Sequence, residues 1–301
     1  MTDISTPPAA TAAPDRAVAN QAATADSLGP LRDLPGYWEG TGVSIIARPD
    51  FNPVNEDGFF LQLNAVRESI EFTSIGSPVI NRGSRQDDIA MYGVTYLWRV
   101  TDAVTGGALH IEPGVLLHVP RTDVPKADPT VVRLSTIPHG NSLTAVGDYE
   151  EIDPTGPPDL PPVNTIPFPL GSEAPPAGTR NPYRAYDLSA DCGHRTSPLP
   201  DGITQRIIDD PMNVVRDGMA GKVITHVTRM FTDTRNGGGV ANIPFVTENA
   251  NSVDCEGEIA VEHVKGPERD YLQLQYHQIA LLDYGGMRYP HVTVGTLVKA
   301  F

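Results

Sequence analysis

Residues 58–72, GFFLQLNAVRESIEF, contain the pattern that decides the fold. Phe59, Leu61 and Leu63 alternate with positions that include a glutamine and an asparagine. Successive side chains of an extended chain point to opposite faces, so a period of two predicts a β-strand with one apolar face.

Similar runs recur along the chain, and turn signals such as Thr105-Gly106-Gly107 and His139-Gly140-Asn141 separate them. Many short strands at roughly ten-residue spacing favour an antiparallel β-sandwich or β-barrel. Further strands are predicted at Val43–Ile46, Met91–Val100, Ala108–Val119, Val131–Thr136, Ser142–Tyr149, Lys222–Thr232, Glu258–Val264, Tyr271–Leu282 and His291–Val298.

A proline-rich stretch at residues 153–202 interrupts this rhythm and includes PTGPPDLPPVNTIPFPLGSEAPPAG at 154–178. Proline cannot donate a ladder hydrogen bond, so we expect an ordered lid over a barrel mouth or a flexible loop. Residues Ile203–Met219 predict one or two short helices, the second starting at Pro211 in the favoured first turn. We therefore expect a single β domain over residues 30–301, with an insertion at 153–221.

The composition excludes several classes of protein. The chain has 301 residues, 40% of them hydrophobic, and a formal net charge of −15. Nucleic acids and anionic membranes are recognised by clustered Lys and Arg, so neither is an expected partner. Cys192 and Cys255 belong to no zinc-binding pattern, and we expect free thiols, with a disulfide as the alternative.

The N-terminal residues 1–29 are rich in Ala, Thr, Pro and Asp and have neither a basic start nor an apolar core. They predict a disordered tail and not a signal peptide. No apolar run approaches the roughly 18–20 residues that span a bilayer, so we expect a cytoplasmic protein.

The histidine that follows Pro290 is the strongest candidate for a ligand-binding residue. Proline usually starts a strand, so His291 is expected at a strand entrance, where an imidazole can point into a barrel mouth. Neutral imidazole is the commonest protein ligand for metals and also ligates haem iron. We expect His291 to hold any cofactor that is present.

A second candidate is the segment Leu109-His110-Ile111-Glu112-Pro113-Gly114. On a strand His110 and Glu112 share a face, where such a pair can bind a metal, relay a proton or form a structural hydrogen bond. His139 is expected at the tip of a hairpin turn.

The stretch 271–278, YLQLQYHQ, puts Gln273, Gln275 and His277 on one face. A row of amides is unusual inside a filled apolar core, so a solvated face is the alternative to an inward one.

Three segments, taken in order, resemble the nitrobindin family of haem-binding β-barrels, which are related in shape to fatty-acid-binding proteins and lipocalins. Trp38-Glu39-Gly40-Thr41-Gly42 resembles the opening W-x-G-x-G motif of that family, and Leu109–Gly114 resembles its central [LM]-H-x-E-x-G strand. The pattern Tyr276…His291…Leu297 resembles its last two strands.

The resemblance implies an up-and-down, calycin-like β-barrel that binds haem b, with His291 as the axial ligand of the iron. It places Leu109 and His110 beside the haem and implies chemistry on peroxynitrite, nitric oxide or a peroxide. The family's barrel is roughly half this length, so the chain would be an enlarged relative. Neither a catalytic residue nor an oligomeric state is predicted.

Two other functions are compatible with the sequence. A barrel of this size can carry an apolar small molecule, with the insertion capping its mouth. Alternatively, His110, Glu112 and a further histidine could form a facial triad for non-haem iron, or the barrel could be a metal-free enzyme.

Overall fold

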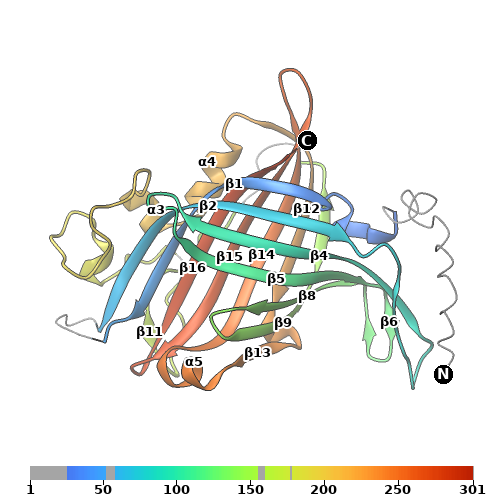
Figure 1. Cartoon of the computed structure of the whole chain (residues 1–301), viewed down its shortest axis with the longest axis horizontal. Coiled ribbons are helices and arrows are strands. Elements are labelled where there is room, and N and C mark those ends of the chain that lie inside the picture. The colour runs from blue at the N-terminus through green and yellow to red at the C-terminus, as the bar shows by residue number, and fades with distance from the viewer. Residues whose placement is uncertain (1–25, 52–57, 155–159, 177, 301) are drawn as a thin grey trace, which may run out of the picture.

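The computed structural model describes residues 26–51, 58–154, 160–176 and 178–300. It is a mainly β structure in which ten long antiparallel strands form a closed barrel, with a few short helices outside it (Figure 1). The predicted fold class is confirmed, and each strand predicted from the alternation lies within or overlaps an observed strand.

The barrel strands follow the order β12-β14-β15-β16-β1-β2-β4-β5-β8-β9, and β9 returns to β12 at the pair Val146 and Asp233. Most neighbours are consecutive in the chain, as in an up-and-down barrel. Their bounds are β1 (Gly36–Pro49), β2 (Phe59–Ser74), β4 (Ile89–Asp102), β5 (Ala108–Val119), β8 (Thr130–Ile137), β9 (Asn141–Gly147), β12 (Val223–Asp233), β14 (Asn251–Lys265), β15 (Tyr271–Tyr284) and β16 (Met287–Lys299).

Shorter elements complete the chain. They are the strands β3 (Val79–Asn81), β6 (Thr122–Asp123), β7 (Lys126–Ala127), β10 (Tyr149–Ile152), β11 (Phe168–Pro169) and β13 (Gly239–Asn242), the 3₁₀ turns η1 (Gly29–Leu31), η2 (Arg184–Tyr186) and η3 (Thr234–Asn236), and the helices α3 (Gln205–Asp209), α4 (Met212–Met219) and α5 (Pro244–Asn249).

One end of the barrel is closed by the residues that precede β1. Leu28, Leu31 and Leu34 are buried in the same apolar cluster as Trp38, whose indole Nε1 donates to the Leu34 carbonyl at 2.7 Å. The folded structure therefore begins before residue 30, the predicted start of the domain, because Leu28 is buried in this cluster. Residues 1–25 of the predicted tail lie outside the described residues.

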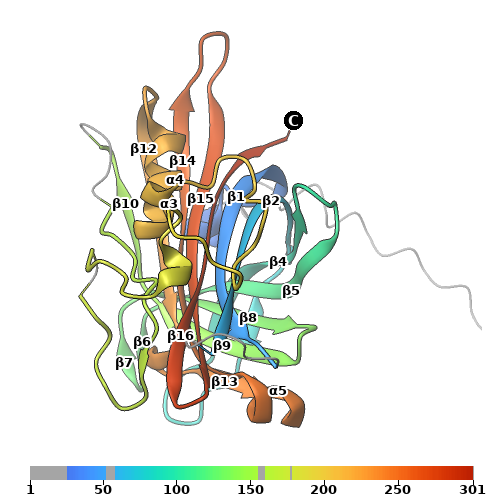
Figure 2. The same ribbon diagram turned by 90° about the vertical axis from the view of Figure 1, so that its left-hand side faces the viewer.

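The insertion between β10 and β12 packs on the outer face of the barrel (Figure 2). Its buried Tyr186 and Ile208 belong to one apolar cluster with Ile45 of β1, Leu61 of β2 and Val292 of β16. The described part of the insertion therefore covers the apolar outward faces of these strands.

Helix α4 shows how the insertion adheres to the barrel. Met212, Val215 and Met219 recur with helical spacing and are all buried, which is the pattern of a helix that covers an apolar surface. Pro211 stands at the N-cap of α4, one position before the predicted first turn. Of the one or two short helices predicted here, two are present, α3 and α4.

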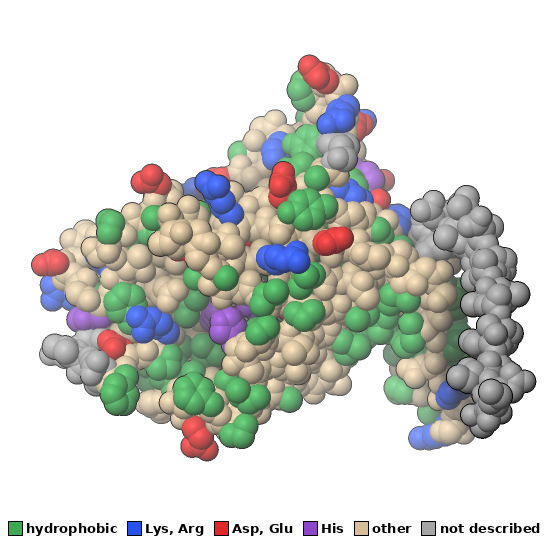
Figure 3. Space-filling model, in the orientation of Figure 1, with side chains coloured by type: hydrophobic (Ala, Val, Ile, Leu, Met, Phe, Trp, Pro, Cys, Tyr) green, Lys and Arg blue, Asp and Glu red, His purple; other side chains and the backbone are tan. Residues whose placement is uncertain are grey.

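The surface in Figure 3 carries scattered acidic and basic side chains with hydrophobic ones between them. Among the described residues, no helix is long and apolar enough to cross a bilayer. Cys192 and Cys255 are free thiols.

Candidate functional site

The strand register brings three histidines from distant parts of the chain to the end of the barrel opposite η1. His291 is near the start of β16 and pairs with Ile46 near the end of β1. His110 is near the start of β5, and His139 is in the turn between β8 and β9, as predicted. We call this part of the barrel the open end.

His291 points into the barrel, as the sequence predicted for a residue at a strand entrance. It is half-buried, and its Nε2 lies 3.5 Å from the Ser44 hydroxyl, which also lies 3.1 Å from the Thr293 hydroxyl. Burial lowers the pKa of His291 to about 4, with smaller contributions from the charges of His110 and His139. The imidazole is therefore neutral at pH 7, which is the form that ligates metals.

His110 is the outermost member of a buried hydrogen-bond network. Its Nε2 lies 3.2 Å from Glu112 Oε2, while Glu112 Oε1 accepts from Arg133 Nη2 at 2.6 Å and from the Tyr96 hydroxyl at 2.5 Å. Glu112 is fully buried. The pair of His110 and Glu112 predicted on one face of a strand is therefore real, and it is anchored by an arginine.

The positive charge of Arg133 keeps Glu112 of this network ionised. Burial alone would raise the pKa of Glu112, but the charge of Arg133 and hydrogen bonds from His110 and Tyr96 outweigh it and hold the pKa well below its usual range. Glu112 is thus a carboxylate, which only accepts hydrogen bonds. The imidazole of His110 stacks on that of His139, with ring centroids 5.9 Å apart and planes 20° apart.

Sequence reasoning missed a second buried carboxyl group, Glu68 of β2. It accepts from Trp98 Nε1 at 2.8 Å and from the Tyr276 hydroxyl at 2.7 Å. Burial raises the pKa of Glu68 to about 7, although both hydrogen bonds oppose the shift. A signal was present, because Glu68 shares an alternating face with the apolar residues Val66 and Ile70.

Gly42 of the opening motif and Gly295 of β16 make room for this carboxyl group. A Cβ at Gly42 would lie 2.7 Å from Glu68 Oε1, and a Cβ at Gly295 would lie 2.6 Å from the ring of Tyr276. The W-x-G-x-G segment therefore has a packing role in the interior, where small residues face large polar ones.

Below the open end the barrel is filled. Trp38, Trp98, Tyr276, Leu274 and Leu297 all belong to the interior cluster, and Leu109 packs against it half-buried. The cavity between Trp98, Arg133 and Gln278 has room for about one water molecule. A bound group would therefore occupy the open end and not the deep interior.

The donor set at the open end restricts the kind of metal group that it could bind. Within the described residues, no group of three or more His, Cys, Asp or Glu side chains converges to hold a metal ion. Glu112, the expected carboxylate ligand of a facial triad with His110 and a further histidine, is bonded to Arg133 and Tyr96. A single neutral imidazole suits a metal that brings its other ligands with it, as haem iron does.

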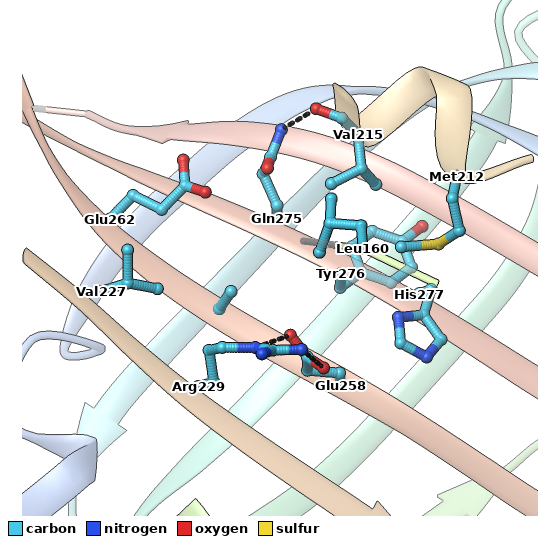
Figure 4. A pocket seen from close by; sticks show the side chains of 11 residues that line it. Leu160, Met212, Val215, Val227, Arg229, Glu258, Glu262, Gln275, Tyr276 and His277 are labelled. Atoms are coloured by element: carbon cyan, nitrogen blue, oxygen red, sulfur yellow. Dashed lines mark hydrogen bonds and ion pairs between the residues drawn. The ribbon is translucent and has the colours of Figure 1, made fainter. Parts of the chain in front are cut away.

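A second pocket lies on the outside of the barrel, under the insertion (Figure 4). The Arg229 guanidinium donates to both carboxylate oxygens of Glu258 at 2.7 Å, and Gln275 Nε2 donates to the Val215 carbonyl of α4 at 2.9 Å. Like the interior cavity, it has room for about one water molecule.

This outer pocket explains the amide row of β15. Gln273 and Gln275 face outward, as the alternative reading had it, but the face is covered by α4 and not solvated. Their amides donate to two carbonyls of α4, those of Val215 and Gly218, and the Gly218 carbonyl lies in the last turn, where a helix offers it no internal donor. The row is therefore an attachment surface for the insertion.

The fold and the open-end residues define a closed ten-stranded antiparallel barrel with two half-buried histidines, His110 and His291, at its open end. No protein-family model matches the chain, and no curated protein matches it in sequence. The crystal structure of Rv2717c from M. tuberculosis is similar over 92% of this chain and 98% of that chain, with a TM-score of 0.44 and 13% sequence identity. These values support no argument about function, so the resemblance to nitrobindins stays a prediction.

Proposed function

We propose that the protein binds haem b at the open end of its barrel, with His291 as the axial ligand of the iron. The observation that carries the proposal is the position of His291, which is inward-facing, half-buried and neutral at pH 7. The resemblance of the three sequence motifs to nitrobindins supports the same group.

The residues of the open end have distinct roles in this proposal. His291 supplies the ligand nitrogen, and the hydroxyls of Ser44 and Thr293 lie on the same interior face beside it. Leu109 contributes apolar surface at the edge of the interior cluster. When bound, haem supplies an iron centre with a coordination position for a small ligand.

By the resemblance, the ligands or substrates are peroxynitrite, nitric oxide or a peroxide. A carrier of an apolar molecule is less well supported, because tryptophan, tyrosine and leucine side chains already fill the deep interior. We propose no role for a bare metal ion, since the described residues contain no converging ligand set.

Haem titration of the purified protein tests the proposal. We expect one haem per chain, a Soret band that reports histidine ligation, and a loss of affinity of at least tenfold in His291→Ala. His194→Ala, which removes a histidine from the insertion, is the matched control and should bind like the wild type. Equal binding by wild type and His291→Ala would refute the role of His291.

A further inference from the structure

The network behind His110 has the arrangement of a proton-transfer device. Glu112 is a buried carboxylate held by Arg133 and Tyr96, and His110 Nε2 lies 3.2 Å from its second oxygen. A carboxylate accepts hydrogen bonds only, so the His110 nitrogen that faces it carries the proton. The other nitrogen, Nδ1, then has a free lone pair and no hydrogen-bond partner among the described residues.

The position of His110 makes this lone pair accessible from the open end. Its side chain is 21% exposed, whereas that of Glu112 is fully buried, so the imidazole lies between the network and the accessible open end. His110 is also close enough to His291 for its charge to affect the pKa of His291. Both imidazoles thus belong to the same open end, and a small ligand bound there next to His110 would meet a proton acceptor.

We propose that His110 is a general base for small weak acids that bind at the open end, and that Glu112 is its positioning residue. In the step, the acid HX loses its proton to Nδ1 of His110, and the anion X⁻ remains at the open end. The imidazolium that forms keeps its Nε2–H on the Glu112 carboxylate, which stabilises the positive charge. No electrons are transferred, and the proton is the only group that moves.

This inference deepens the proposed function, because it concerns the ligand class of the same site. It predicts a preference for ligands that must lose a proton on binding, such as hydrogen cyanide or a hydroperoxide, over neutral diatomic ligands that carry none. His139 serves as the internal comparison. It lies beside His110, but none of its nitrogens has a carboxylate partner among the described residues.

The first test requires no haem. Long-range ¹H–¹⁵N correlation spectra of the ¹⁵N-histidine-labelled, haem-free protein at pH 7.5 distinguish the two neutral tautomers of each histidine, with His110→Leu identifying the signal. We expect the Nε2–H tautomer for His110 in the wild type and a mixture in folded Glu112→Gln. An Nδ1–H tautomer in the wild type would overturn the proposal even if Glu112→Gln fails to fold.

The second test uses the haem-loaded protein and hydrogen cyanide as the probe. We expect His110→Leu to slow cyanide association to the ferric protein about 100-fold, within the range of general-base effects, and to leave carbon monoxide association to the ferrous protein within about threefold. His139→Leu should change neither rate by more than about threefold. Equal slowing of both ligands in His110→Leu would show a steric role only and overturn the proposal.

The two tests separate this inference from the proposed function. If the wild type binds no haem, the proposed function fails, and the tautomer of His110 still reports whether Glu112 orients it. If haem binds but cyanide associates with ferric His110→Leu as fast as with the wild type, the proposed function stands and the role of His110 as a general base is refuted.

Discussion

Glu112 and Arg133 form an ion pair inside the barrel, with Arg133 Nη2 2.6 Å from Glu112 Oε1 and both side chains buried. The register of β5 and β8 places Glu112 and Arg133 on the inner faces of neighbouring strands, where the hydroxyl of Tyr96 adds a third partner. The network therefore links three strands of the barrel, β4, β5 and β8.

Removing one partner of this ion pair should destabilise the barrel strongly. Arg133→Met leaves the buried Glu112 carboxylate without its cation, and such losses cost about 3–5 kcal/mol. Urea unfolding followed by circular dichroism measures the change. The double variant Arg133→Met/Glu112→Gln should recover part of the loss, because no charge then remains buried.

The exposed ion pair of Arg206 and Asp217 provides the matched control for this experiment. Exposed pairs contribute about 0–1 kcal/mol, so Arg206→Ala should have a small effect. A loss for Arg133→Met no larger than that for Arg206→Ala would contradict the account of the interior network.

The glycine of the L-H-x-E-x-G segment is predicted to be essential for packing against the same network. A Cβ at Gly114 would lie 2.3 Å from Cζ of Tyr96, and Tyr96 is held by Glu112 and Arg133. Gly114→Ala should therefore cost about 1–3 kcal/mol in urea unfolding, as overpacking does. Gly193→Ala, where a Cβ would meet nothing within 4 Å, should be nearly neutral. Equal effects of the two substitutions would show that Tyr96 is free to move.

These packing relations show how far the sequence predicts the structure. Alternation such as that of residues 58–72 predicts the strands, because side-chain direction depends only on the chain's own period. The position of the insertion was not predicted. Its proline content indicates that it is not part of a sheet, but does not indicate which surface of the barrel it covers. Tyr186 and Ile208 pack on the apolar outer faces of β1, β2 and β16, and these strands come from distant parts of the sequence.

The candidate site was predicted in part for the same reason. His291, His110 and Glu112 stand on recognisable strand segments, and their inward orientation follows from the strand register. Arg133 and Glu68 look like ordinary charged residues in the sequence, because their partners are on other strands. Only a charged residue at an otherwise apolar inward position indicates that such a partner must exist.

Glu68 predicts a pH dependence of stability. Its pKa is raised from 4.5 to about 7 in the folded barrel, so the folded state binds more protons than the unfolded state between these values. The contribution of Glu68 to stability is present below pH 4.5 and is lost as the pH rises through 7, by about 3 kcal/mol in total. Glu68→Gln keeps the shape and cannot ionise, so its stability relative to the wild type should increase by about this amount from pH 4.5 to pH 8.

Unfolding by urea at a series of pH values measures this difference. Glu71→Gln, at an exposed position of the same strand, is the matched control and should show a nearly constant difference. A pH-independent difference for Glu68→Gln would mean that the Glu68 carboxyl is not held in its neutral form by the barrel.

The lowered pKa of His291 predicts how haem affinity depends on pH. Iron binds the neutral imidazole, and burial keeps His291 neutral down to about pH 4. Haem affinity should therefore be constant from pH 8 to about pH 5 and should fall only below that, over the range in which circular dichroism shows a folded protein. A midpoint near 6.5, the value of an unperturbed histidine, would contradict the burial of this imidazole.

Resonance Raman spectroscopy of the ferrous haem-loaded protein tests the axial ligation by His291 most directly. We predict an iron–histidine stretching band in the wild type, its absence in His291→Gly, and its return when exogenous imidazole is added to that variant, with an isotope shift when the imidazole is deuterated. An iron–histidine band that persists unchanged in His291→Gly without imidazole would contradict the account.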